Sequence, residues 1–107
     1  MSHTQQLLYA PERMHLKPER VQQLLRELPG WSLGAGGRAI ERSRQFTSVA
    51  EAAEFVGLAG KLATAQRQPV TIALAGRNVT LALTGHPIKG CTGGLTNPVF
   101  RLAAVLG

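Results

Sequence analysis

Residues 70–84 read VTIALAGRNVTLALT, and this stretch decides the fold. Apolar side chains alternate with small or polar ones in both of its halves, and the run AGRN at residues 75–78 separates the halves. A period of two residues is typical of a strand that buries one face. Two such runs joined by a short turn predict a β-hairpin with one apolar face. The alternating apolar residues are Val70, Ile72, Leu74, Val79, Leu81 and Leu83.

A helix over residues 49–65 is expected directly before this hairpin. Ser48 and Glu51 fit the capping box, in which the two side chains satisfy backbone N–H groups at the start of a helix. Small apolar residues recur along one helical face, and they suit a close approach to a sheet. This face contains Val49, Ala52, Ala53, Val56, Ala59, Gly60 and Ala63, and Phe55, Leu58 and Leu62 widen it.

A helix at each end of the domain and a second pair of strands complete the fold. Pro18 favours the first turn of a helix, Pro29-Gly30 ends it, and Asn97-Pro98 is an N-cap followed by a first-turn proline. The additional elements are a helix over residues 18–28, strands over 31–33 and 38–46, and a helix over 97–106. The order α-β-β-α-β-β-α predicts an α+β fold in which three helices cover one face of a four-stranded antiparallel sheet.

Length and composition indicate one domain of ordinary globular type. At 107 residues, the chain buries roughly 65% of its unfolded surface. We expect a loose N-terminal arm over residues 1–15 and a single domain over residues 16–107. No run approaches the roughly 20 apolar residues of a membrane span, and the N-terminus lacks the apolar centre of a signal peptide. Cys91 is the only cysteine, so no intramolecular disulfide forms. These features favour a cytoplasmic protein.

The formal net charge is +6, and it is spread evenly along the chain. Because no basic block or tail is present, we expect no direct binding of nucleic acid and no membrane partner. A basic surface either is simply solvated or attracts an acidic partner. The chain contains no aspartate, which excludes every mechanism that requires one.

Three arginines share one side of the strand expected over residues 38–46. They are Arg38, Arg42 and Arg44, and their guanidinium groups cannot all be buried without partners. One interpretation is a solvated edge strand. The other is a docking surface for acidic groups on another protein.

Other residues that often carry chemistry give no coherent site. His86 and Cys91 lie in one loop, but no third residue is evident that would orient them as a base and a nucleophile. The glycine-rich run over residues 89–94 lacks the order of a phosphate-binding loop. His3, His15 and His86 show no metal-ligand spacing. We therefore expect no metal and no cofactor.

Several short signatures, in this order, resemble the pterin-4a-carbinolamine dehydratase family. They are Leu28-Pro29-Gly30-Trp31, Ile40-x-Arg42 followed by Phe46, the proline-led hairpin at Pro69, and Gly93-Gly94-Leu95-Thr96 before the last helix. The resemblance covers about residues 18–106. It implies the fold derived above and self-association as a homodimer through paired sheet edges, with a tetramer through helix packing as the further option.

The resemblance also implies where the family's chemistry lies, and this chain departs from the pattern there. The family carries His-His-Pro after its long helix, whereas this chain has Arg67-Gln68-Pro69. His86 matches the family's third histidine, but Pro87 follows where an aspartate is expected. Arginine stays protonated at working pH and glutamine has no titrating proton, so neither can move the protons of a dehydration. The resemblance therefore implies a degenerate pocket and no enzymatic activity.

The sequence is similar to a catalytically degenerate branch of this family that occurs with α-carboxysome genes. That branch resembles a Rubisco assembly factor. It implies a non-enzymatic chaperone that binds Rubisco subunits in the cytoplasm, in association with the carboxysome. Two alternatives stay open: an active or residual pterin-4a-carbinolamine dehydratase, and a dimerisation cofactor of a transcription factor.

Overall fold

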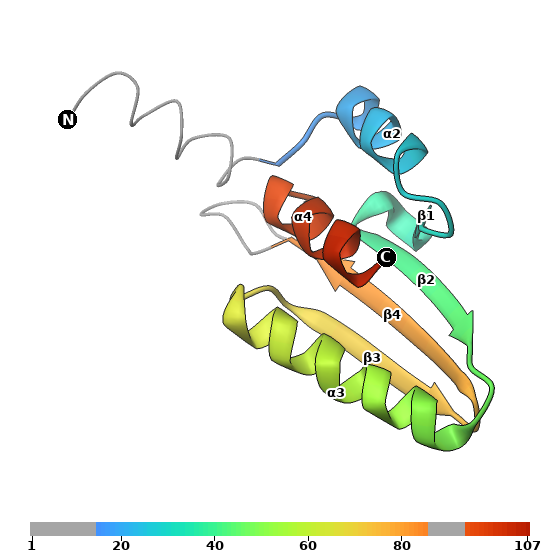
Figure 1. Cartoon of the computed structure of the whole chain (residues 1–107). Coiled ribbons are helices and arrows are strands. Elements are labelled where there is room, and N and C mark those ends of the chain that lie inside the picture. Colours follow the sequence, from blue (N-terminus) through green and yellow to red (C-terminus); the bar gives the residue numbers. More distant parts are fainter. Residues whose placement is uncertain (1–14, 86–93) are drawn as a thin grey trace.

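The computed structural model describes residues 15–85 and 94–107, and its elements follow the expected order (Figure 1). A short 3₁₀ helix, η1, occupies the turn between the first two strands. The elements are α2 (Pro18–Arg26), β1 (Ser32–Leu33), η1 (Ala35–Gly37), β2 (Ala39–Gln45), α3 (Val49–Ala65), β3 (Val70–Ala75), β4 (Asn78–Thr84) and α4 (Asn97–Leu106). The expected arm lies almost wholly outside the described residues.

The four strands form one antiparallel sheet in the order β1-β2-β4-β3. The helices lie on one face of it (Figure 1), which confirms the expected α+β fold. Cross-strand pairing builds rows of side chains on the helix-covered face. The three rows are Ile40, Leu83 and Val70; Arg42, Leu81 and Ile72; and Arg44, Val79 and Leu74. The opposite face carries mainly small and polar residues, among them Ser43, Thr80 and Ala73.

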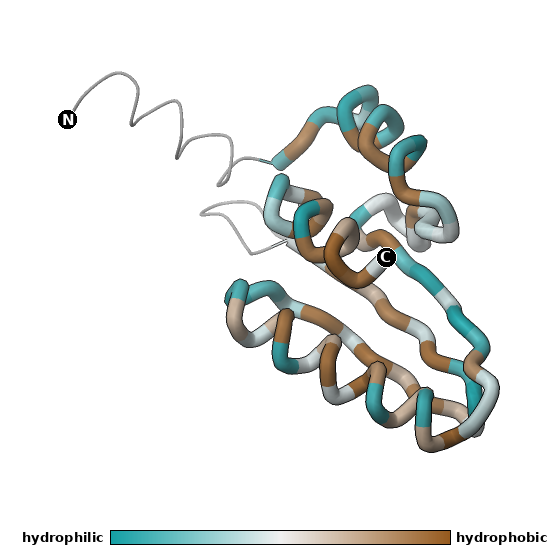
Figure 2. The backbone as a smooth tube through the Cα atoms, viewed as in Figure 1, coloured by the Kyte–Doolittle hydropathy of each residue, from teal (hydrophilic) through white to brown (hydrophobic). Residues whose placement is uncertain are grey.

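The core lies between the central strand β4 and the helices. Figure 2 shows hydrophobic segments alternating along β4, while hydrophilic residues run along much of β2. This difference arises because Arg42 and Arg44 occupy positions on β2 whose partners on β4, Leu81 and Val79, are fully buried. The largest fully buried side chains are Ile40, Leu81, Leu83, Leu102, Val79 and Val99.

The helix α3 begins as expected, but only half of the capping box forms. The Ser48 hydroxyl accepts a hydrogen bond of 3.1 Å from the backbone N–H of Glu51. The Glu51 carboxylate accepts from the Thr47 hydroxyl instead of returning to the backbone N–H of Ser48. One side-chain acceptor at the N-cap is therefore enough to start this 17-residue helix.

The buried stripe of α3 is narrower than the sequence suggested. It is centred on Ala52, Ala59 and Ala63, whereas Val49 and Leu58 are 55% and 52% exposed. The expectation that these two residues belong to the packing face is wrong, and so is the same expectation for Ala53, which is exposed as well. A helix turns by about 100° per residue, so Leu58 lies roughly a quarter turn away from Ala59. A single sheet covers only one narrow face of the helix.

The N-cap of the last helix lies one residue before Asn97, the residue expected to be the cap. Thr96 is the N-cap of α4, and Asn97 and Pro98 are the first two helical residues. No helix within residues 15–85 or 94–107 is long and apolar enough to span a membrane.

Candidate functional site

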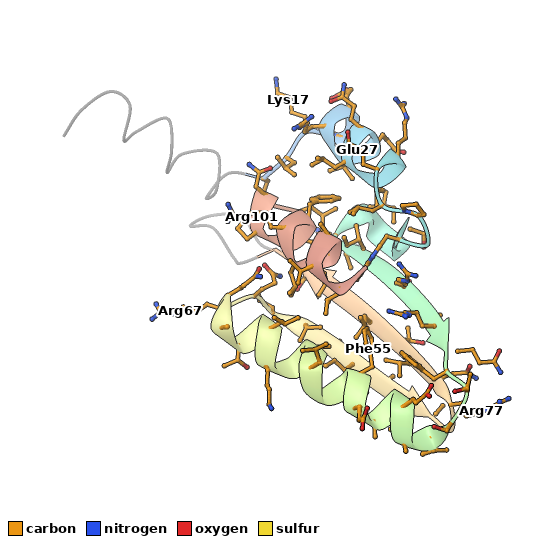
Figure 3. All side chains as sticks on the ribbon, viewed as in Figure 1. Lys17, Glu27, Phe55, Arg67, Arg77 and Arg101 are labelled. Carbon is orange, nitrogen blue, oxygen red and sulfur yellow. The ribbon has the colours of Figure 1, made fainter. Side chains whose placement is uncertain are left out.

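The C-terminus of α3 determines where the residues of the expected pocket lie. The backbone N–H of Gln68 donates to the carbonyl of Ala63 at 2.9 Å, and that of Arg67 donates to Thr64 at 3.1 Å. This pair of bonds is the Schellman motif, which requires a left-handed residue after the C-cap. Arg67 supplies it with φ 52°, a conformation that glycine adopts more readily. The side chain of Arg67 consequently points away from the molecule (Figure 3).

Gln68, the next residue, turns inward and is only 4% exposed. Its side-chain amide Nε2 donates to the backbone carbonyl of Thr84, at the end of β4, and to that of Pro69 at 3.0 Å. The amide therefore ties the end of α3 to the end of the central strand. The other side-chain atom, Oε1, is buried without a hydrogen-bond partner among the described residues. Gln68 thus has a structural role, and it offers no proton for transfer.

The backbone beside Gln68 is closely packed. A Cβ atom on Gly85 would collide with the carbonyl oxygen of Gly94, so only glycine fits at this approach between β4 and α4. Thr96 is 2% exposed, and its hydroxyl has no partner in the described part of the chain. The backbone N–H of Leu16 donates to the carbonyl of Leu95 at 2.7 Å, which fixes the start of the domain here.

The structure does not bring all of the expected pocket residues together. Arg67 and Pro69 are exposed, Gln68 is buried, and His86 lies outside the described residues, as does Cys91. At the end of α3 the described residues supply no pair of titrating side chains. Within the same ranges, no group of three or more His, Cys, Asp or Glu residues could hold a metal ion.

The three arginines of the second strand also divide. Arg38 is the exposed C-cap of η1 and precedes β2. The expectation that it belongs to the strand is therefore wrong. Arg42 and Arg44, here called the arginine pair, both lie half-buried on the helix-covered face of β2. The sequence pattern placed them on one face correctly. It could not show that this face is the one beneath the helices.

Two phenylalanines hold the guanidinium of Arg44. Its carbon Cζ lies 5.0 Å from the ring centroid of Phe46 on the same side of the sheet and 4.8 Å from that of Phe55 on α3. The two ring centroids are 5.1 Å apart, with the ring planes tilted by 38°. A cation is attracted to the faces of aromatic rings at such distances. The rings therefore fix the position of the guanidinium and leave its N–H donors without an acidic partner in the described residues.

Arg42 is held by the turn between α2 and β1. Its Nη1 donates to the carbonyl of Pro29 at 3.1 Å, and its Nε is buried without a described partner. Gly30 has φ 89°, and a Cβ there would lie 3.1 Å from the guanidinium carbon of Arg42. The Pro29-Gly30 turn thus fits closely against this arginine. The sequence pattern did not predict the contact of Arg42 with this turn or that of Arg44 with Phe55, because each joins residues from different elements.

The described residues thus form a small α+β domain in which Gln68 joins α3 to β4 and the arginine pair lies half-buried on the helix-covered face of β2. A family model described as "Pterin 4 alpha carbinolamine dehydratase" matches residues 14–106. The chain therefore belongs to the pterin-4a-carbinolamine dehydratase family.

Curated relatives agree with this assignment. The chain is 35% identical over 75 residues to a protein of Cupriavidus pinatubonensis named "Putative pterin-4-alpha-carbinolamine dehydratase 1", over 70% of this chain and 65% of that protein. It is 32% identical over 77 residues to a Rubrobacter xylanophilus protein named "Putative pterin-4-alpha-carbinolamine dehydratase", over 72% of this chain and 71% of that protein. The match thus spans just under two thirds of the first relative's length.

A solved structure shares the fold. It is described as "Crystal structure of transcriptional coactivator/pterin dehydratase from Brucella Melitensis" and superposes with a TM-score of 0.76. The match covers 87% of this chain and 95% of that one at 24% sequence identity.

Proposed function

We propose that this chain is a non-enzymatic assembly factor that binds Rubisco subunits on a dehydratase-like scaffold. The observation that supports the non-enzymatic part is the position of Gln68, whose amide is occupied by the carbonyls of Thr84 and Pro69. Dehydration of a carbinolamine requires one group that delivers a proton and one that removes a proton. A buried glutamine amide and an outward-pointing Arg67 supply neither.

The binding part of the proposal is supported by the arginine pair. A guanidinium with free donors binds carboxylates through paired hydrogen bonds, and Arg44 is held in place before any partner arrives. Arg38, exposed just before β2, extends the basic surface. Rubisco as the partner, and the association with the carboxysome in the cytoplasm, follow from the resemblance to the α-carboxysomal branch.

Co-expression tests the assembly role directly. Rubisco subunit genes of an α-carboxysome would be expressed in a bacterial host with and without this chain, and assembled holoenzyme would be quantified by native gel and carboxylation activity. We expect the chain to raise the yield, the Arg44→Glu variant to lose the effect, and the Arg20→Glu variant on α2 to retain it. An unchanged yield with the wild-type chain contradicts the proposal.

The names of the curated relatives favour a dehydratase as the second candidate. Incubation of the purified chain with the pterin carbinolamine distinguishes the two, since turnover comparable to that of an active family member would contradict the non-enzymatic proposal. The words "transcriptional coactivator" in the description of the Brucella protein favour a third candidate, a cofactor of a transcription factor. Recovery of a DNA-binding protein as the specific partner, in place of Rubisco, would support it.

We also propose that the chain forms a homodimer along the free edge of β3. Among the residues that the structure describes, this strand ends the sheet, and its Leu74 is 45% exposed. An uncovered edge strand pairs readily with a second copy, and pairing removes the exposed backbone groups. A tetramer through helix packing is the larger assembly that the family resemblance suggests.

A further inference from the structure

The outer edge of β2 is open over half of its length. β1 pairs only with Ile40 and Glu41, because β1 contains two residues. Beyond that point, residues 42–45 have no neighbouring strand on this side among the residues that the structure describes. An unpaired row of backbone N–H and C=O groups is a template for another strand.

The hydrogen-bond pattern shows which backbone groups face outward at this edge. On the outer side, the N–H of Gly34 donates to the carbonyl of Ala39 at 2.8 Å, and on the inner side the N–H of Phe46 donates to Arg77 at 2.9 Å. Antiparallel strands alternate between the two sides with each residue. The backbone groups of Ser43 and Gln45 therefore point away from β4, toward the open edge.

The arginine pair lies immediately beside these groups. A strand added to the edge would place every second side chain on the helix-covered face, about 5 Å from the residue opposite. Those side chains would meet the guanidinium groups of Arg42 and Arg44, which have no acidic partner in the described ranges. Alternating carboxylates on the added strand would match this arrangement in both spacing and charge.

We infer that this edge binds an extended acidic segment of a partner protein by strand addition to residues 42–45 of β2. Backbone hydrogen bonds to Ser43 and Gln45 hold the segment, and its carboxylates pair with Arg42 and Arg44. A second copy of this chain is a poor occupant, because pairing β2 with β2 would bring like charges side by side. The inference deepens the proposed binding role by naming the partner's chemistry, and it does not depend on that partner being Rubisco.

A peptide tests the inference without a natural partner. The probe is a fluorescent nine-residue peptide with glutamate at alternate positions, separated by threonine and valine. One control peptide replaces each glutamate by glutamine. A second carries N-methyl groups on the amides that would face the strand edge. Binding is measured by fluorescence anisotropy with the full chain at low and physiological salt.

We expect saturable binding of the acidic peptide that weakens with salt, at least tenfold weaker binding to Arg44→Glu, and less than a twofold change for Arg20→Glu. Gln45→Pro removes one outward N–H, leaves the bonds to β4 intact, and should also abolish binding. If Gln45→Pro does not fold, judged by circular dichroism, the N-methylated peptide tests the same hydrogen bonds.

Three outcomes would overturn the inference: no binding of the acidic peptide, equal binding of the glutamine peptide, or equal binding of the N-methylated peptide. Conversion of a dimer to a monomer by Gln45→Pro would also overturn it, since a second copy would then occupy the edge. Peptide binding without any effect on Rubisco assembly would contradict only the proposed function.

Discussion

The guanidinium carbon of Arg44 lies 4.8 Å from the ring centroid of Phe55, and this contact joins the inner strand β2 to the long helix α3. Figure 3 shows Phe55 on the side of α3 that faces the sheet. In an ordinary core row, an apolar side chain would stand at the position of Arg44, beside Val79. The half-buried arginine instead places its guanidinium carbon over both rings. Arg44 therefore contributes to packing and, under the proposed function, also to partner binding.

The first prediction concerns this contact. Arg44→Ala removes two cation–π contacts and the packing of the aliphatic stem, so we expect the free energy of unfolding to fall by about 1–2 kcal/mol. Arg44→Lys keeps the charge but loses the planar guanidinium, so its free energy of unfolding should lie between those of the wild type and Arg44→Ala. Urea denaturation followed by circular dichroism measures the change. Lys61→Ala, an exposed cation on α3, is the control and should cost less than about 0.5 kcal/mol. Equal effects at residues 44 and 61 would contradict the role of the rings.

The second prediction concerns the amide of Gln68. Gln68→Leu keeps a similar volume but leaves the carbonyl of Thr84 without this donor, so we expect a loss of about 1–3 kcal/mol in the free energy of unfolding. Gln66→Leu makes the same change at the exposed C-cap, two residues earlier, and should be nearly neutral. Chemical denaturation of both variants tests this. A stable Gln68→Leu protein would show that the amide does not hold α3 to β4.

The third prediction concerns the left-handed conformation of Arg67. Glycine adopts this conformation without steric cost, so Arg67→Gly should stabilise the protein by up to about 1 kcal/mol. For a domain of this size, that corresponds to a rise of roughly 4–8 °C in Tm. Gln66→Gly, one residue earlier and without a positive φ, should lower the Tm instead. Because the Arg67 side chain points away from the sheet, Arg67→Gly should also leave Rubisco assembly unchanged.

The hairpin, the helices and their order could be predicted from the sequence because each follows from local periodicity and end signals. The arginine pair could be predicted only in part. Alternation places Arg42 and Arg44 on one face of β2. Whether a helix covers that face depends on where α3 packs, and the strand pattern does not show that α3 brings Phe55 to Arg44. The position of Arg67 could not be predicted from its match to the family's first histidine. Its direction depends on how the helix ends, through hydrogen bonds that no residue pattern displays.

The fourth prediction separates the two open edges of the sheet. The backbone N–H and C=O groups of Ser43 point to the outer edge of β2. By the same alternation, the backbone groups of Ile72 and Leu74 point to the outer edge of β3. Leu74→Pro removes an outward N–H from β3, so we expect it to convert the proposed dimer into a monomer in sedimentation experiments. Gln45→Pro makes the matching change on β2 and should leave the dimer intact. A wild-type chain that is monomeric at micromolar concentration would reject the dimer itself.

The last prediction tests the fit between Gly30 and Arg42. Gly30→Ala forces alanine into φ 89° and brings its Cβ within 3.1 Å of the guanidinium carbon. Gly36 has φ 79° and nothing within 4 Å of a Cβ, so Gly36→Ala measures the backbone cost alone, about 1–2 kcal/mol. We expect Gly30→Ala to destabilise more than Gly36→Ala by denaturant unfolding. The additional loss of stability in Gly30→Ala, relative to Gly36→Ala, should become smaller when Gly30→Ala is combined with Arg42→Ala. A double-mutant cycle measures this difference. An excess that persists without the Arg42 side chain would mean that the turn is constrained by something other than this arginine.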